Sequence, residues 1–195
     1  MKTIIKFGLL TLALVLVGTS FTTSEEAVGN ESSTIIWTGT KVTGEHTGTL
    51  DFKTVAWKFD EAGTLISANF IVDMTSIKNT DLDKEPAAKL VGHLNSADFF
   101  NTAVYPTAEF KTTSVKSIGD GEYEITGDMT IKETTESLTF NANVTNDGHM
   151  KHCTATVTID RSKSDVRYGS GSFFDGLGDK MIYDDFVLEI DIKKH

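Results

Sequence analysis

The stretch "EYEITGDMTIKETTESLTFNANV", residues 122–144, indicates the fold of this chain more clearly than any other. Apolar and polar residues alternate in it twice, on either side of a charged, Thr-rich turn at 132–136. Alternation with a period of two residues is typical of a β-strand with one buried face. The inner face of the first strand is Tyr123, Ile125, Gly127, Met129 and Ile131, and that of the second is Leu138, Phe140, Ala142 and Val144.

The same pattern continues in both directions from this hairpin. Further strands are predicted at 33–44, 47–54, 55–60, 64–74, 106–115, 153–160 and 185–193. Turns rich in Gly, Asp, Asn or charge are predicted at 45–48, 60–63, 118–122 and 146–149. Inner faces can be assigned to four of these strands. They are Ile66, Ala68, Phe70, Val72 and Met74 in 64–74; Ala108 and Phe110 in 106–115; Cys153, Ala155, Val157 and Ile159 in 153–160; and Phe186, Leu188, Ile190 and Ile192 in 185–193.

Eight or nine strands on hairpin-length connections form an antiparallel sheet, and their polar faces exclude a buried parallel sheet. Either a closed barrel or a two-sheet sandwich is compatible with the series. We expect an all-β, antiparallel, up-and-down barrel of about eight strands with a short helical insertion, because consecutive long hairpins close most simply in that way.

Two segments interrupt the strands. In 79–106, Ala87, Leu90, Val91 and Leu94 recur at helical spacing after Pro86, which suits a first helical turn. Asn95 or Ser96 is expected to cap a second short turn carrying Phe99 and Phe100. The other segment, 160–185, is glycine-rich and aperiodic, and long loops of this kind in compact domains are usually functional or disordered.

The first residues have the layout of a secretory signal peptide, with Lys2 and Lys6 before an apolar run and then small residues. The alternative is a membrane anchor. We predict a signal peptide at 1–22, a flexible segment at 23–33 and a periplasmic or secreted barrel domain at 34–193. Loss of the two lysines takes the formal charge from -10 to -12, which disfavours a nucleic-acid partner. Cys153 is the only cysteine, so the fold has no intrachain disulfide.

The interior of such a barrel can be packed solid or can hold one small ligand. Large aromatic residues alternate here with Ala, Gly and Thr, which favours room for an elongated apolar guest. Phe99 and Phe100 are expected either to reach a cavity mouth or a partner, or simply to plug the barrel. Phe173 and Phe174 pose the same choice in the glycine-rich loop.

Charged and nucleophilic residues give weak signals for chemistry. His149 and His152 point to opposite faces of an extended chain, Cys153 is a small buried residue, and a pair of His93 with Asp98 is less expected than a surface histidine. The alternation of the strand at 153–160, in which Ile159 points inward, predicts that the Arg161 side chain also points inward, at the rim of the barrel. There it either binds a polar head group or forms a structural ion pair with Asp165, Asp184 or Asp185, and the ion pair is favoured.

Several motifs in fixed order resemble the YceI-like family of bacterial exported proteins. They are "VDMTSIKNTD", "LVGHLNSADFFNTAVYPTAEFKTTSV", "YEITGDMTIKETTESLTF", "IDRSKSDVRYG" and "MIYDDFVLEIDI". Together they span about residues 34 to 193. The family often has Gly and Pro in the turn that reads "KETTESL" here, so Glu133 and Ser137 depart from its pattern.

The resemblance implies a lipocalin-like barrel without catalysis that binds, stores or transports a polyisoprenoid, an isoprenoid quinone or a similar long-chain amphiphilic lipid. No cofactor and no stable membrane span after signal cleavage are expected, and a homodimer is left open. The predicted ligand-binding residues are Phe70, Val72, Leu94, Phe99, Phe100, Phe110, Met129, Phe140, Phe186 and Arg161. The alternative function is a non-catalytic exported scaffold protein with a packed core, and an exported hydrolase comes third.

Overall fold

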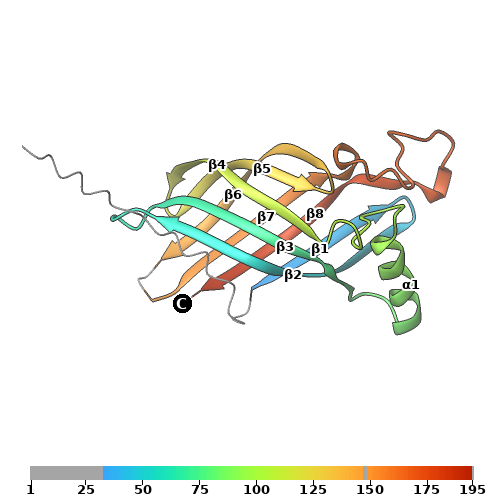
Figure 1. The fold of residues 1–195 in the computed structure, drawn as a ribbon, viewed down its shortest axis with the longest axis horizontal. Helices are drawn as coiled ribbons and strands as arrows, with labels where there is room; N and C mark the ends of the chain where they lie inside the picture. Colours follow the sequence, from blue (N-terminus) through green and yellow to red (C-terminus); the bar gives the residue numbers. More distant parts are fainter. Residues whose placement is uncertain (1–32, 147–148, 195) are drawn as a thin grey trace, which may run out of the picture.

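The computed structural model describes residues 33–146 and 149–194, which form one closed antiparallel barrel of eight strands (Figure 1). Each strand pairs with the next in the sequence, and β1 closes the barrel against β8. This confirms the predicted up-and-down barrel. The strands are β1 Thr34–Lys41, β2 Gly44–Phe59, β3 Leu65–Asn79, β4 Thr107–Gly119, β5 Glu122–Ile131, β6 Thr134–Asn146, β7 Lys151–Asp160 and β8 Ile182–Lys194.

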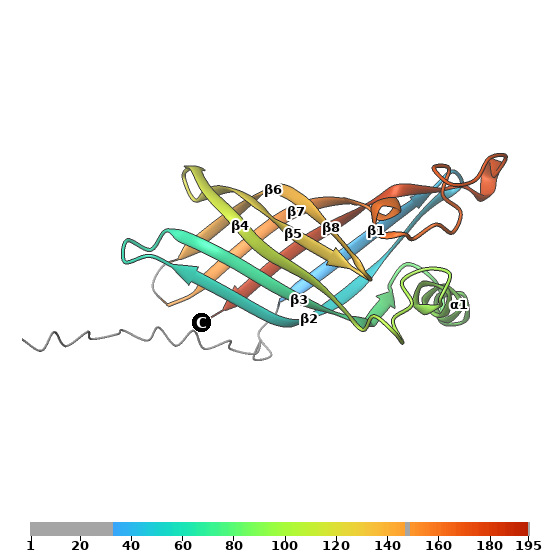
Figure 2. The same ribbon diagram turned by 45° about the horizontal axis from the view of Figure 1, so that its top comes forward.

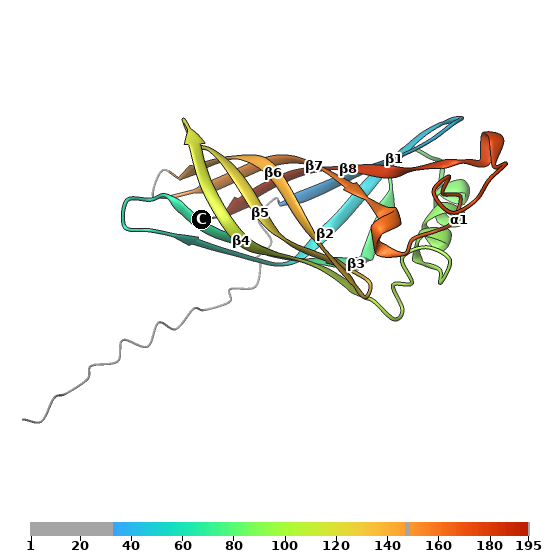
Figure 3. The ribbon, with the colours of Figure 1, turned by 90° about the horizontal axis from the view of Figure 1, so that it is seen from above.

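The two ends of the barrel differ. At one end, here named the capped end, lie the β1–β2 turn, the β5–β6 turn, helix α1 (Lys84–Asn95) and the segment 161–181 between β7 and β8 (Figure 2). The other end, here named the far end, carries the β2–β3, β4–β5 and β6–β7 connections, and β1 starts and β8 ends toward it. Seen from above, segment 161–181 extends beyond the strands at the capped end, and α1 lies beside the β1–β2 hairpin (Figure 3).

The hairpin at 122–144, formed by β5 and β6, has a shorter turn than predicted. Only Lys132 and Glu133 form the β5–β6 turn, with Lys132 at a φ of 57°, and Ile131 pairs with Thr134. Residues 134–136, predicted as turn, are therefore already in β6. The inner faces assigned to β5 and β6 by parity are buried or half-buried, as expected.

Two other local predictions were wrong. The turn expected at 45–48 lies at 42–43, and β2 runs unbroken through the two strands predicted at 47–54 and 55–60. Ile66, assigned to the inner face of β3, is 44% exposed. A shift of register between Lys58 and Phe59 leaves Ile66 without a partner across the ladder, so Leu65 takes the inward position.

Two glycines allow aromatic rings to lie flat across the strands. A Cβ on Gly48 would stand 2.5 Å from the Trp37 ring, and a Cβ on Gly127 would stand 2.4 Å from the Phe110 ring. Both distances are far inside van der Waals contact, so glycine at these positions is what gives each ring its space. Trp37 also donates its indole N–H to the carbonyl of Lys78 at 3.1 Å, which fixes its orientation.

Helix α1 is short and lies across the capped end. Pro86 stands in its first turn, as predicted, and Leu94 is its one buried residue. The start of the insertion is tied to β2 through Asp81, which accepts hydrogen bonds from His46, the N–H of Thr47 and Asn79. Burial would raise the pKa of Asp81, but these hydrogen bonds outweigh it and lower the pKa to about 2.

The described part of the chain has no helix with the length and apolar character needed to cross a membrane. Residues 1–32 lie outside the described residues. The signal peptide predicted at 1–22 and the flexible segment predicted at 23–33, apart from Ser33, therefore stay predictions.

Candidate functional site

An apolar cavity of about 90 Å³ lies inside the capped half of the barrel. Its walls come from all the strands except β6, together with Leu94 of α1 and the turn that follows it. Arg161 is the one charged residue in its lining. The lining is Ile35, Trp37, Gly39, Leu50, Val72, Met74, Ile77, Leu94, Phe99, Phe100, Ala108, Met129, Ile131, Ile159, Arg161, Ile182, Tyr183, Phe186 and Leu188.

Outside the cavity lining, a layer of phenylalanine rings crosses the interior. This layer, here named the aromatic layer, consists of Phe52, Phe70, Phe110 and Phe140. Neighbouring ring centroids in it are 5.3 to 6.1 Å apart. Phe70 and Phe110 of this layer belong to a buried cluster that extends into the far half and includes Val55, Ile125 and Ile192. The barrel is therefore hollow in its capped half and packed in its far half.

At the capped end the cavity is closed by contacts between two segments distant in the sequence. His93 of α1 packs edge-on against Tyr168 of segment 161–181, with ring centroids 4.2 Å apart, and against Phe99 at 5.7 Å. Phe99 and Phe100 are 7% and 8% exposed, and Phe100 contacts Phe186 of β8. Both phenylalanines are thus buried inside the barrel and line its cavity.

Arg161 holds segment 161–181 in place. Its guanidinium is 2% exposed and donates to the carbonyls of Val166, Tyr168, Ile182 and Tyr183 at 2.7 to 3.2 Å. These bonds explain how a cation is tolerated beside an apolar cavity, since a buried charge needs partners for its donors.

The carboxylate that pairs with Arg161 is Asp184, with Nη2 to Oδ1 at 3.3 Å, and the guanidinium also lies 5.3 Å from the centre of the Phe99 ring. Burial lowers the pKa of Arg161, while the charges of Asp184 and Asp160 act in the opposite direction. Of the two roles predicted for Arg161, the structure contains the ion pair. Contact with a ligand head group stays a prediction.

The structure brings most of the predicted ligand-binding residues together. Seven of the ten are in the cavity lining: Val72, Leu94, Phe99, Phe100, Met129, Phe186 and Arg161. Phe70, Phe110 and Phe140 belong instead to the aromatic layer. Whether a ligand touches any of them stays a prediction.

Sequence reasoning missed Trp37, Ile35 and Leu50, which line the cavity from β1 and β2. In the sequence, Ile35 and Trp37 are two residues apart and therefore share one face of the strand. Which face of this strand points inward was not assigned from the sequence. The pairing of Trp37 with Gly48 across the hairpin was a usable signal, because an aromatic residue often covers a glycine on the adjacent strand.

The remaining polar side chains singled out from the sequence have structural surroundings. Among the described residues no group of three His, Cys, Asp or Glu side chains is placed to hold a metal ion. Cys153 is buried, and burial together with the charge of Asp191 raises the pKa of its thiol to about 12.

Ser96, expected to cap the second turn, donates a hydrogen bond from its hydroxyl to the carbonyl of His93, and the side chain of Asn95 accepts one from the Thr102 hydroxyl.

Comparison with known proteins gives one family and several relatives. Residues 27–194 match the family model described as the YceI-like domain. Protein YceI of Escherichia coli O157:H7 is 38% identical over 91 residues, which are 46% of this chain and 44% of that protein. The chain therefore aligns with less than half the length of this relative.

Two solved structures have the same fold. Burkholderia cenocepacia BcnA superposes with a TM-score of 0.68 at 23% identity, over 84% of this chain and 96% of the other. A domain from Saccharophagus degradans, described as a polyisoprenoid binding domain implicated in plant cell wall breakdown, has a TM-score of 0.59 at 14% identity, over 83% and 92%. At these identities the likeness concerns the fold alone.

Proposed function

This chain belongs to the YceI-like domain family, and from that premise we propose that its barrel binds the prenyl part of a polyisoprenoid or a similar long-chain amphiphilic lipid. The observation that carries the proposal is the apolar cavity with a single charge, Arg161, at its capped end. A related fold from Saccharophagus degradans bears the description of a polyisoprenoid binding domain, which supports the same ligand class. The proposed role is sequestration, with no chemical step.

The driving force is removal of hydrocarbon from water. Each buried CH₂ of the ligand contributes about 0.8 kcal/mol, so a few isoprene units outweigh the cost of ordering the chain. A polar head would stay at the capped end, because the lining offers it no partner deeper inside. Arg161 is the nearest charged group there, although four backbone carbonyls already accept from its guanidinium.

The volume sets a limit on the ligand. A buried water needs roughly 10–15 Å³ on the same scale, so a cavity of about 90 Å³ is equivalent to about six to nine waters. This corresponds to roughly one or two isoprene units. A longer chain must displace side chains of the aromatic layer or leave part of itself outside the capped end.

The two tryptophans provide a direct test, because Trp37 lines the cavity and Trp57 lies against the far-half cluster. In a Trp57→Phe variant, titration with geraniol or farnesol should change the emission of Trp37 saturably. In a Trp37→Phe variant the emission of Trp57 should stay constant. A response that is equal in both variants, or absent from both, would contradict binding in this cavity.

Native mass spectrometry addresses the natural ligand. Protein isolated from a bacterial envelope should carry an adduct of lipid mass that added isoprenoid quinone displaces. The alternative role as a scaffold protein would gain support if no adduct were found and a second protein co-purified in fixed stoichiometry.

Export is a further part of the proposal, and it rests on the sequence of residues 1–22 alone. The expected outcome is a mature protein that begins between Ser20 and Ser24 in the periplasmic or secreted fraction. N-terminal sequencing of that fraction tests it, and an intact Met1 on fractionated protein would contradict it.

A further inference from the structure

Exposed apolar side chains gather at the capped end. Among the described residues, nine large apolar side chains are exposed, and six of them lie at this end. Five are in its connections, namely Val42, Val104, Tyr168, Phe173 and Phe174, and the sixth, Tyr183, is near the start of β8. Ile66 and Ile118 lie at the far end and Ile36 on the barrel wall. An uneven distribution of this kind marks an interaction surface, whereas single scattered apolar residues need no explanation.

Two of the six residues, Tyr183 and Tyr168, connect this surface to the cavity. Tyr183 lines the cavity itself, and Tyr168 packs on His93, which contacts the cavity residue Phe99. The backbone N–H of Val42 donates to the carbonyl of Met181 at 3.1 Å, which joins the β1–β2 turn to segment 161–181. The exposed apolar rim is thus continuous with the site proposed for the lipid.

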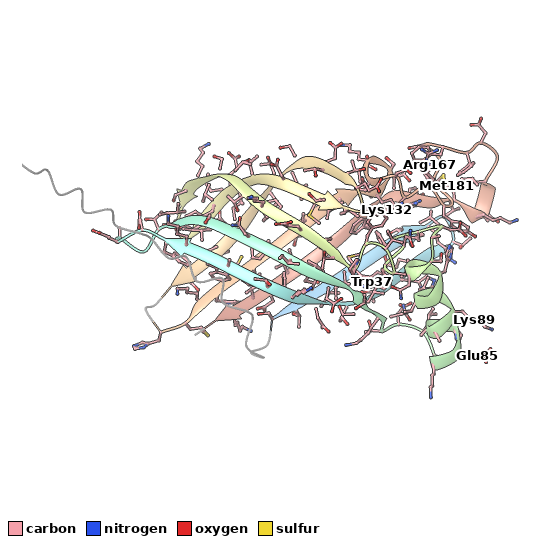
Figure 4. The ribbon with its side chains drawn as sticks, viewed as in Figure 1. Trp37, Glu85, Lys89, Lys132, Arg167 and Met181 are labelled. Atoms are coloured by element: carbon pink, nitrogen blue, oxygen red, sulfur yellow. The ribbon has the colours of Figure 1, made fainter. Side chains whose placement is uncertain are left out.

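Cations accompany these aromatic residues. A groove beside Phe174 is lined by Lys132, Arg167 and Lys180. Only two carboxylates, Asp98 and Asp165, share its lining, and Asp165 is already paired with Arg167. The Arg167 guanidinium also lies 5.0 Å from the centre of the Phe173 ring, and Lys132 donates to the carbonyl of Asp165. Figure 4 shows Lys132 and Arg167 together at this end, beside Met181.

We propose that the capped end docks on a bilayer containing anionic phospholipid, with the exposed rings among the head groups and the groove cations on lipid phosphates. Aromatic side chains with a polar edge favour this depth, and basic side chains near an anionic surface each add attraction. The proposal rests on the proposed function, since a carrier must bring its mouth to the membrane that supplies or receives its lipid.

The acidity of the whole chain does not prevent such docking. The formal net charge is -10, but the strands that separate the two ends have up to 16 residues. Even a strand of 13 residues such as β6 places the far end roughly 30 Å away once its tilt is included. Screening at physiological salt acts over about 8 Å, so a membrane senses mainly the charges of the nearest end. Other carboxylates of the capped end lie outside the groove lining and reduce the attraction, so docking requires that the groove cations face the bilayer. They include Glu133, Asp160, Asp175, Asp179, Asp184 and Asp185.

Vesicle flotation tests the surface. The full mature chain is mixed with vesicles of phosphatidylcholine alone or of phosphatidylcholine with an equal part of phosphatidylglycerol. Binding is expected to be stronger to the anionic vesicles. Phe173→Ser with Phe174→Ser should lower it roughly tenfold, because two rings lose their burial in the interface. Ile66→Ser at the far end, with a similar exposed fraction, should leave it unchanged.

The contribution of the groove cations is tested with Lys180→Gln in the same vesicle assay. Lys58→Gln, at the far end, is the control variant. Loss of one lysine near an anionic surface should weaken binding about fivefold. The loss should be confined to anionic vesicles, and Lys58→Gln should have no effect. Equal binding by the parent and the double serine variant would overturn the proposal, as would failure of the parent to bind either vesicle.

The same variants separate this proposal from the proposed function. Farnesol added without vesicles reaches the cavity from solution, so the Trp37 response should be the same in the double serine variant and in the parent. If the parent shows the Trp37 response to farnesol but does not bind vesicles, the docking proposal is wrong and the proposed lipid site is unaffected. A missing response in a folded parent overturns the lipid site itself.

Discussion

At Arg161, one buried side chain stabilises the whole segment that closes the barrel. Its donors satisfy two carbonyls of segment 161–181, those of Val166 and Tyr168, and two at the start of β8, those of Ile182 and Tyr183. Sequence parity predicted that the side chain turns inward, because it continues the inner face of β7. Asp184, the carboxylate that pairs with it, was one of three candidates predicted from the sequence. The four carbonyl partners could not be predicted, since they lie up to 22 residues further along the chain, beyond a loop without periodicity.

Arg161→Lys is expected to destabilise the fold by about 2–4 kcal/mol, because an ammonium cannot reach all these carbonyls and leaves some of them buried without a donor. Arg167→Lys, at a side chain that is 59% exposed, serves as the control and should cost less than about 1 kcal/mol. Urea unfolding followed by fluorescence measures both. Equal midpoints for the two variants would show that the carbonyl contacts contribute nothing.

Cys153 should be inert in the folded protein. With a thiol pKa of about 12, only about one molecule in 10⁴ carries the thiolate at pH 8, and the side chain is 5% exposed. The raised pKa also means that stability is complete below about pH 9, the ordinary range of a thiol, and declines as the pH rises toward 12. Labelling with a thiol reagent at pH 8 should become fast only in denaturant; rapid labelling of native protein would contradict the buried position.

Among the elements, the hairpins from β5 to β8 and the helical insertion were predictable, whereas the extent of β2 and the contacts within the cap were not. Alternation fixed the inner faces of β5 to β8, because one face of each strand is buried over its length. It failed at Ile66, since a bulge depends on the register with the partner strand and leaves no mark in the sequence of one strand. The contacts of His93 with Tyr168 and of Arg161 with Phe99 join segments about 70 residues apart.

The two glycine environments predict substitutions of opposite sign. Gly92→Ala, inside α1 with no atom within 4 Å of an added Cβ, should stabilise the protein by about 0.5–1 kcal/mol. Gly127→Ala should destabilise it by about 1–3 kcal/mol, because the Cβ meets both the Phe110 ring and the carbonyl of Lys111. Thermal unfolding of the two variants checks the signs. Stabilisation by Gly127→Ala would mean that Phe110 does not lie across that glycine.

At the scale of the whole molecule, the aromatic layer divides one barrel into two halves with different tasks. The far half is packed by a buried cluster, and the capped half keeps the cavity. Composition predicted large aromatic residues inside a barrel, but not their gathering into one layer, because that depends on how β2, β3, β4 and β6 are aligned. The depth available to a ligand is therefore set by four rings and not by the length of the strands.

This division predicts how affinity depends on chain length. Geraniol, farnesol and geranylgeraniol are each one isoprene unit longer than the last, and a fully buried unit should raise affinity far more than tenfold. From geraniol onward the gain per unit should fall below about threefold, because added carbons must displace the aromatic layer.

Phe140→Ala, at a half-buried ring of the layer, should restore a gain of at least tenfold from geraniol to farnesol by opening the path to the far half. Phe59→Ala removes a half-buried ring that faces Trp57 outside the layer and is the matched control, with the parent's length dependence. Titrations followed by Trp37 in the Trp57→Phe background, with thermal unfolding of each variant, measure the series. If the affinity of the parent rises by the same large factor with each added isoprene unit, the aromatic layer does not limit the length of the bound chain.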